Sequence, residues 1–288
     1  MRNVVYLRDN LVAVGGKTGV LSIWDIATLK LLRKTQYLKQ DVIWLQASSD
    51  KSLLIAGDSE GNLVTIDVIE DRLLYSHSFA TDQGIETSFL PNQRDFIIAC
   101  EGDIFLCADS SIIQIGSHSD YPIHIATAYE GKRLIVGDNV GEVLVYNLDR
   151  LKIINGTQIS SYPIQFVGSI NATQAIVVDG EYIHILDLDN MSTKLIREVE
   201  NRHSSHVTSV DIMAKKNRMA ACTTTGALLV SDYTKDSVLQ SYIVDSAKAY
   251  TGVTFTNTAS KFALSDYYGN LTVWDVEDNI ALHLSEED

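Results

Sequence analysis

Proline, cysteine and long hydrophobic runs are all scarce in this chain. Three prolines in 288 residues leave no proline-rich linker that would divide it into domains. The three cysteines, Cys100, Cys107 and Cys222, cannot all pair, and each lies in an apolar strand pattern. This pattern predicts buried free thiols in a reducing compartment, although Cys100 and Cys107 flank one hairpin and could face each other.

The chain has no segment that predicts export or membrane insertion. No apolar run reaches the roughly 18 residues that a membrane-spanning helix needs. The first residues contain no apolar stretch followed by a small-residue cleavage site, so we expect no secretory signal. We therefore expect a cytoplasmic and/or nuclear protein.

Positive charge is also in short supply. The chain has 23 Lys and Arg against 37 Asp and Glu, which gives a formal net charge of −14. A field of this sign repels phosphate backbones and anionic lipids, so we expect neither direct nucleic-acid binding nor membrane binding. The acidic balance fits a basic protein partner, and maintenance of solubility alone also explains it.

Signatures of catalysis and of metal binding are sparse. The chain contains no H-E-x-x-H, no C-x-x-C and no G-x-x-x-x-G-K-[ST] motif. The segment from Gly15 to Gly19 looks faintly like a phosphate loop, but it connects two expected strands and opens no helix. His203 and His206 could in principle hold a metal ion, yet no cysteine is near, and we expect His206 to begin a strand. We expect no enzyme, no cofactor and no metal.

The chain does contain a heptapeptide that occurs near its beginning and again near its end. Gly19–Asp25 and Gly269–Asp275 each consist of a glycine, an alternating apolar strand and Trp-Asp. Five weaker copies lie between them. The position of the tryptophan falls at 24, 66, 107, 146, 186, 231 and 274, in steps of 39 to 45 residues. One repeat unit is therefore used seven times.

Each unit divides into four expected strands, which we letter a to d in chain order. In the first unit these are residues 3–7, 11–15, 20–25 and 29–33. Tyr121-Pro122-Ile123 and Tyr162-Pro163-Ile164, 41 residues apart, mark the start of strand a in units four and five. The pattern predicts one all-β domain over residues 1–288.

The repeat resembles the WD-repeat β-propeller family, and the two Trp-Asp copies and the spacing carry the likeness. The resemblance implies a seven-bladed β-propeller of four-stranded antiparallel blades. The family's Asp-His-Ser/Thr-Trp hydrogen-bond tetrad is mostly missing, so we expect apolar packing between blades to stabilise the fold. We expect residues 280–284 to complete the last blade without an exchanged N-terminal strand. The alternatives are a missing N-terminal piece or a partner's strand added to an open edge.

On a propeller, the d-to-a connections and the b-to-c turns share one face. This placement predicts an acidic rim with interleaved tyrosines, suited to a Lys- or Arg-bearing peptide. The alternative is that the carboxylates serve turn geometry and the tyrosines pack between blades. The candidate partner-binding residues are Asp58, Glu60, Glu101, Tyr121, Asp138, Tyr162, Tyr250, Asp266, Tyr267 and Tyr268.

The resemblance implies a non-enzymatic protein–protein interaction platform, a scaffold subunit of a larger intracellular complex. One alternative is an adaptor that recruits substrates or peptides to a ubiquitin ligase or a chromatin complex. A remote alternative is a propeller enzyme with its active site in the channel, where His124, Asp41, Glu86 and Asp211 are the ionisable candidates.

Overall fold

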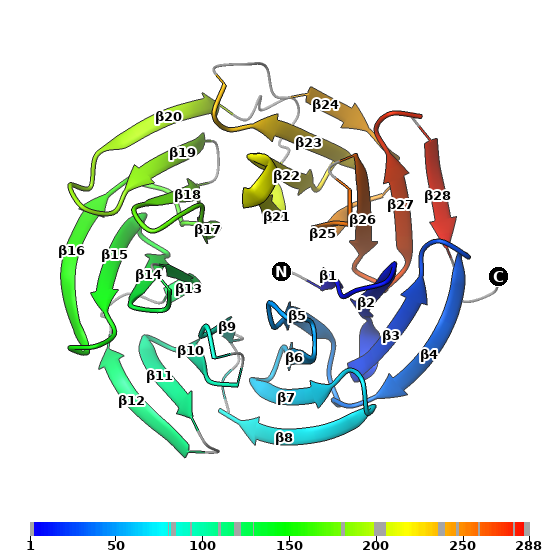
Figure 1. Cartoon of the computed structure of the whole chain (residues 1–288), viewed down its shortest axis with the longest axis horizontal. Helices are drawn as coiled ribbons and strands as arrows, with labels where there is room; N and C mark the ends of the chain where they lie inside the picture. Colours follow the sequence, from blue (N-terminus) through cyan, green and yellow to red (C-terminus); the bar gives the residue numbers. More distant parts are fainter. Residues whose placement is uncertain are drawn as a thin grey trace. The chain divides into compact units, whose positions relative to one another are not determined.

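Over the residues that it describes, the computed structural model of the chain contains β-strands and two short 3-10 turns (Figure 1). It describes residues 3–79, 81, 85–92, 94–108, 111–117, 122–128, 130–179, 182–198, 206–235, 240–245, 248–258, 260–278 and 280–284. Within these ranges, 28 strands form seven antiparallel sheets of four strands. Neighbouring strands of a sheet are consecutive in the chain, so each sheet is one repeat unit.

The described residues group into two compact units, and the first contains Met1–Ala47, Lys51–Gly84 and Ser205–Asp288. It holds sheets 1, 2, 6 and 7. Sheet 1 is β1 (Val4–Tyr6), β2 (Leu11–Gly15), β3 (Val20–Asp25) and β4 (Lys30–Gln36), with η1 (Lys17–Gly19) between β2 and β3. Sheet 2 is β5 (Val42–Ala47), β6 (Leu53–Asp58), β7 (Asn62–Asp67) and β8 (Arg72–Ser78). Sheet 6 is β21 (Val207–Met213), β22 (Arg218–Thr223), β23 (Ala227–Asp232) and β24 (Gln240–Ile243), with η2 (Ala214–Lys216) between β21 and β22. Sheet 7 is β25 (Tyr250–Phe255), β26 (Lys261–Asp266), β27 (Leu271–Asp275) and β28 (Ile280–Leu284).

The second unit contains Ser48–Asp50 and Ile85–Ser204 and holds sheets 3, 4 and 5. Sheet 3 is β9 (Glu86–Phe89), β10 (Phe96–Cys100), β11 (Asp103–Ala108) and β12 (Ser111–Ser117). Sheet 4 is β13 (Pro122–Ala128), β14 (Arg133–Asp138), β15 (Glu142–Asn147) and β16 (Lys152–Gln158). Sheet 5 is β17 (Phe166–Ser169), β18 (Gln174–Val178), β19 (Tyr182–Asp187) and β20 (Thr193–Glu198).

The predicted division into seven four-stranded units is confirmed, with one correction in sheet 5. Its first strand begins at Phe166, three residues after the Pro163 that was expected to mark its start. The Ile164 N–H instead donates to Asp138 O of sheet 4, at 2.8 Å. Tyr162-Pro163-Ile164 therefore joins two sheets before strand a begins.

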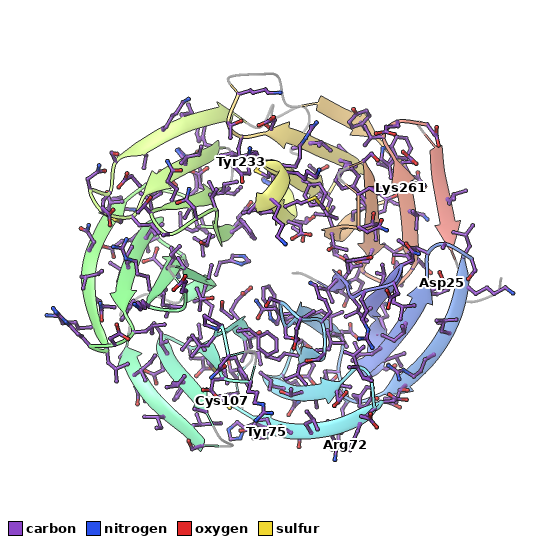
Figure 2. All side chains as sticks on the ribbon, in the orientation of Figure 1. Asp25, Arg72, Tyr75, Cys107, Tyr233 and Lys261 are labelled. Atoms are coloured by element: carbon purple, nitrogen blue, oxygen red, sulfur yellow. The ribbon has the colours of Figure 1, made fainter. Side chains whose placement is uncertain are left out.

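The aspartate that ends the heptapeptide begins the turn between strands c and d. Asp25 Oδ1 accepts the Ala27 N–H at 2.9 Å and the Thr28 N–H at 3.3 Å (Figure 2). The Ala27 bond, followed by the contacts with Thr28, holds the pKa of this carboxyl below its usual value. Aspartate suits this position because its short side chain reaches backbone N–H groups two residues on. The same capping bonds occur at Asp67, Asp187, Asp232 and Asp275.

The glycine that begins the heptapeptide allows the end of strand d to pass close to the b–c turn. The carbonyl of Gly19 accepts the N–H groups of Tyr37 and Leu38, which follow β4. Gly61, Gly141 and Gly226 receive equivalent bonds after β8, β16 and β24. Gly19 has φ +77°, and a Cβ there would lie 2.0 Å from Leu38 O. Only glycine fits this position without strain.

Apolar side chains pack between neighbouring sheets. This packing was expected because the hydrogen-bond tetrad of the WD-repeat family is mostly missing from the sequence. One buried cluster joins sheets 1 and 2 and includes Leu21, Val42 and Leu45. Similar clusters join sheets 6 and 7, 7 and 1, 3 and 4, and 4 and 5. Trp24 lies in the cluster of sheets 7 and 1, and its indole N–H donates to Ser22 Oγ at 3.0 Å. Burial of these apolar side chains stabilises the packing of neighbouring sheets.

The three cysteines are buried free thiols, as the sequence predicts. Cys107, labelled in Figure 2, lies on β11. It is opposite Phe96, whereas Cys100 lies opposite Asp103, so the two do not face each other across the hairpin. Burial raises the pKa of Cys222 to about 12, which keeps that sulfur protonated.

Sheets 7 and 1 are joined through Asn3, which immediately precedes β1. Its side-chain oxygen accepts from Thr251 Oγ1 at 3.0 Å and Ser265 Oγ at 2.7 Å. Its amide donates to Asp266 O at 3.1 Å and Gly15 O at 3.4 Å. Sheet 7 takes its fourth strand from β28, so the expected closure without strand exchange is confirmed.

Candidate functional site

Three carboxylates that the sequence placed on a partner-binding rim are buried turn residues, which corrects that prediction. Asp58, Asp138 and Asp266 end the b strands of sheets 2, 4 and 7 and are 0%, 0% and 7% exposed. Asp58 Oδ1 accepts the N–H groups of Glu60 and Asn62, at 3.0 and 2.9 Å. Asp138 and Asp266 bind the N–H groups two and four residues on in the same way. These side chains close the b–c turns and do not present charge to a partner.

The turn of Asp138 differs from the turns of Asp58 and Asp266 in the residue that follows the turn glycine. The Asn62 and Asn270 side-chain amides donate to the second carboxylate oxygen of Asp58 and Asp266, at 2.9 and 2.8 Å. Sheet 4 has Glu142 in this place, and buried Asp138 Oδ2 has no hydrogen-bond partner in the part of the chain that the structure describes.

This difference makes Glu142→Asn a stabilising substitution. The new amide would satisfy Asp138 Oδ2, and we expect the free energy of unfolding to rise by about 1 kcal/mol. Thermal unfolding of the purified chain measures the change. The converse control, Asn62→Glu, should lower stability by a similar amount because it removes the amide from Asp58. No gain in Glu142→Asn would contradict this account of the turn.

The remaining rim residues occupy different environments. Tyr250 is 1% exposed and packs in the cluster of sheets 6 and 7, so the prediction that it faces a partner is wrong. Burial raises its pKa to about 12. Tyr121 lies outside the described residues. Glu60 and Glu101 are exposed in turns, and Tyr162 is 45% exposed.

Tyr267 and Tyr268 are the exposed aromatic residues of the b–c turn of sheet 7. They are 43% and 67% exposed, and their rings meet edge to face, with centroids 5.9 Å apart. This turn lies directly against the b–c turn of sheet 1, because a Cβ added to Gly269 would be 2.9 Å from Gly16 Cα. Two glycines thus allow two turns from opposite ends of the chain to meet.

Lys17 and Asp41 join these tyrosines, and we call the four residues the Tyr267 cluster. Lys17, in the turn of sheet 1, places Nζ 4.9 Å from the Tyr267 ring centroid and 4.4 Å from that of Tyr268. Asp41, which immediately precedes β5, accepts the Tyr267 hydroxyl at 2.7 Å and the Thr18 N–H at 3.0 Å. Three consecutive sheets, 7, 1 and 2, therefore contribute to one exposed cluster.

The charges of the Tyr267 cluster are coupled through hydrogen bonds. The Tyr267 hydroxyl, followed by the Thr18 N–H, lowers the pKa of Asp41. The same hydrogen bond to a carboxylate raises the pKa of Tyr267. The site thus combines a carboxylate whose ionised form is favoured, the two tyrosine rings and the Lys17 side chain. This combination of aromatic area and fixed charge is suited to binding a protein segment.

The sequence analysis predicts Tyr267 and Tyr268 as binding residues but not their contacts with Lys17 and Asp41. Asp41 and Tyr267 are separated by 226 positions. The sequence points to Asp41 only as an ionisable candidate of the channel, and to the Gly15–Gly19 segment, which contains Lys17, only as a faint likeness to a phosphate loop. No local pattern encodes their contact, because it depends on how sheets 7, 1 and 2 pack.

The channel candidates for catalysis make contacts within their own units. Asp211 Oδ2 accepts Thr254 Oγ1 and the Phe255 N–H, both at 2.9 Å, and so links β21 to β25. His124 Nδ1 lies 3.1 Å from Glu86 Oε1 in the second unit, whereas Asp41 belongs to the Tyr267 cluster. Asp211 and Asp41 thus link neighbouring sheets of the first unit, and His124 and Glu86 pair with each other in the second.

Two loop motifs also have structural settings. Gly57–Gly61 matches the G-x-S-x-G pattern of serine hydrolases, but it is a turn between two strands and not a strand-to-helix elbow. In the glycine-rich segment of sheet 1, the Thr18 N–H is already bonded to Asp41 and so is not free to bind a phosphate.

Across the described ranges, no group of three His, Cys, Asp or Glu residues could hold a metal ion, and His203 lies outside them. No helix in those ranges is long and apolar enough to cross a membrane.

Comparison with known proteins identifies the fold. No family model matches the chain, and no curated protein matches its sequence. The β-propeller domain of Cps50 (Swd1) from Myceliophteria thermophila is 15% identical over 96% of this chain and 96% of that chain, with a TM-score of 0.82. A chain in the structure of the mitotic checkpoint complex is 16% identical over 96% of this chain and 89% of that chain, with a TM-score of 0.77.

These likenesses and the seven sheets define the class of protein. The chain has the fold of a seven-bladed β-propeller with four-stranded antiparallel blades. The resemblance drawn from the two Trp-Asp copies and the repeat spacing is thereby confirmed for the fold.

Proposed function

We propose that residues 1–288 form a non-enzymatic protein–protein interaction platform, a scaffold subunit of a larger assembly in the cytoplasm or nucleus. The Tyr267 cluster is its partner-binding surface. The main observation behind this proposal is that Tyr267 and Tyr268 are 43% and 67% exposed. The Tyr267 hydroxyl is bonded to Asp41, and the turn that contains both tyrosines packs against the b–c turn of sheet 1. Fixed exposed aromatic side chains act as interface anchors because they lose little conformational entropy on binding.

Three further observations support this proposal. The channel candidates Asp211 and Asp41 bond to neighbouring sheets and so have structural roles, which favours a binding role over catalysis. The net charge of −14 favours basic protein partners. The mitotic checkpoint complex is by its name an assembly, and a propeller chain within it has the same fold as this chain.

Affinity purification from the native cell, followed by quantitative mass spectrometry, tests the proposal. The full chain carries a tag, and Tyr268→Ser is compared with the wild type. We expect the amount of the principal protein recovered with Tyr268→Ser to be at least tenfold lower than with the wild type. The variant should fold normally, because an exposed anchor contributes to binding and little to stability.

Leu32→Ser is the matched control. Leu32 is 56% exposed on β4, so the substitution removes a similarly exposed apolar group outside the cluster. Its recovery of partners should equal that of the wild type. Equal recovery by wild type and Tyr268→Ser would reject the surface, and a tagged chain that purifies alone would reject the scaffold subunit.

A further inference from the structure

The Lys17 side chain occupies a site that could hold a cation from another molecule. Its Nζ lies over two tyrosine rings at once, 4.9 and 4.4 Å from their centroids. The rings stand nearly perpendicular, with an interplanar angle of 77°. Asp41, whose carboxylate accepts the Tyr267 hydroxyl at 2.7 Å, is the acidic residue of the cluster. Two aromatic rings therefore contact one cationic position, and a carboxylate is bonded to the hydroxyl of one of them.

The Tyr267 side chain and the Tyr268 backbone are held by hydrogen bonds, whereas the Lys17 side chain reaches the rings from a neighbouring turn. The Tyr267 hydroxyl is held by Asp41 at 2.7 Å, and the Tyr268 N–H is held by Asp266 Oδ1 at 2.9 Å. Lys17 is exposed in the neighbouring turn and reaches the rings through a flexible four-carbon chain. Removal of Lys17 from the rings would therefore leave the two tyrosines and Asp41 in place.

We propose that Tyr267, Tyr268 and Asp41 form a binding site for a lysine or arginine side chain of a protein partner. Lys17 occupies this site in the free chain as an internal competitor. The inference rests on the proposed function and names the chemistry of the partner. A positively charged partner is attracted by the net charge of −14, and its side chain takes the place of Lys17 over the rings.

The competition predicts an effect of Lys17 that is opposite to that of an ordinary contact residue. If Lys17 itself bound an acidic partner, its removal would weaken binding. If Lys17 blocks the site, its removal strengthens the binding of cations. An exposed cation–π contact corresponds to about a twofold to fivefold change in a binding constant.

Titration of the full chain with a small cation tests the site directly. The probe is N-acetyl-lysine methylamide, and the neutral counterpart is N-acetyl-norleucine methylamide. NMR of protein labelled at the tyrosine rings follows binding, and Tyr268→Leu assigns the Tyr268 signals. We expect Lys17→Ala to bind the lysine probe about twofold to fivefold more tightly than the wild type does. The norleucine compound should not shift the Tyr268 ring signals.

The controls separate this inference from the proposed function. Adding Tyr268→Leu to Lys17→Ala should abolish the response to the lysine probe, while thermal unfolding stays unchanged. Equal binding by Lys17→Ala and the wild type, or equal responses to lysine and norleucine, would overturn the inference. If Tyr268→Ser still loses its partner in cells, the interaction platform stands without the cation site. If the lysine probe binds as predicted but Tyr268→Ser recovers its partner as the wild type does, the cation site is supported and the Tyr267 cluster is rejected as the partner-binding surface.

Discussion

Asp58→Lys is expected to lower the free energy of unfolding by about 4 kcal/mol or more, the largest effect that we predict. The carboxylate is fully buried and accepts the Glu60 N–H, the Asn62 N–H and the Asn62 amide. The substitution leaves these donors without an acceptor and places an ammonium group in a buried position. The midpoint of thermal unfolding, followed by circular dichroism, should fall by roughly 10 °C.

Glu60→Lys, two residues further along the same turn, is the matched control. Glu60 is exposed, and its carboxylate accepts from Gln40 Nε2 at 2.8 Å. Exposed polar contacts contribute little, so the midpoint should shift by only about 1 to 2 °C. An Asp58→Lys protein as stable as Glu60→Lys would show that the aspartate does not close the turn.

Gly19→Ala is expected to lower the free energy of unfolding by about 3 to 5 kcal/mol. The glycine has φ +77°, a backbone conformation that costs an alanine energy. The added methyl group would also lie 2.0 Å from Leu38 O and 2.1 Å from Leu38 C. Because backbone atoms cannot rotate away, the chain leaving β4 has to move. Chemical unfolding followed by tryptophan fluorescence measures the loss.

Gly16→Ala in the same turn separates backbone strain from a general sensitivity of the segment. Gly16 has φ −119°, and the nearest atom to an added Cβ is Tyr268 O at 3.6 Å. Alanine fits there in ordinary contact, so stability should change by less than about 1 kcal/mol. Similar losses in the two variants would contradict the assignment of Gly19 as the crowded position.

The repeat made most of the fold predictable from sequence. Each copy carries its own turn chemistry, so the predicted strands Leu11–Gly15 and Val20–Asp25 match β2 and β3. The glycine needed beside Leu38 and the aspartate that caps the next turn are both local signals. Strand ends set by contacts between sheets were less predictable. Ile164 is an example, since its N–H bonds to sheet 4 before strand a begins.

The candidate site was less predictable, because a residue type does not reveal its burial. Asp58 and Asp41 are both aspartates, but Asp58 is buried in a turn. Asp41 is only partly buried and accepts a hydrogen bond from Tyr267. Tyr250 and Tyr268 are likewise buried and exposed, respectively. A spacing of three separates Asp58 from Gly61, Asp138 from Gly141 and Asp266 from Gly269, and this repeated pattern could have identified the aspartates as turn residues. The contact of Lys17 with Tyr268 had no such signal.

Oxidative footprinting of the purified assembly tests the central claim, that the Tyr267 cluster is the surface that binds a partner. Hydroxyl radicals modify exposed tyrosines, and mass spectrometry compares the free chain with the assembly. We predict that oxidation of Tyr267 and Tyr268 falls several-fold in the assembly while that of Leu32 does not change. Unchanged oxidation of both tyrosines, with protection at other exposed residues, would contradict the account.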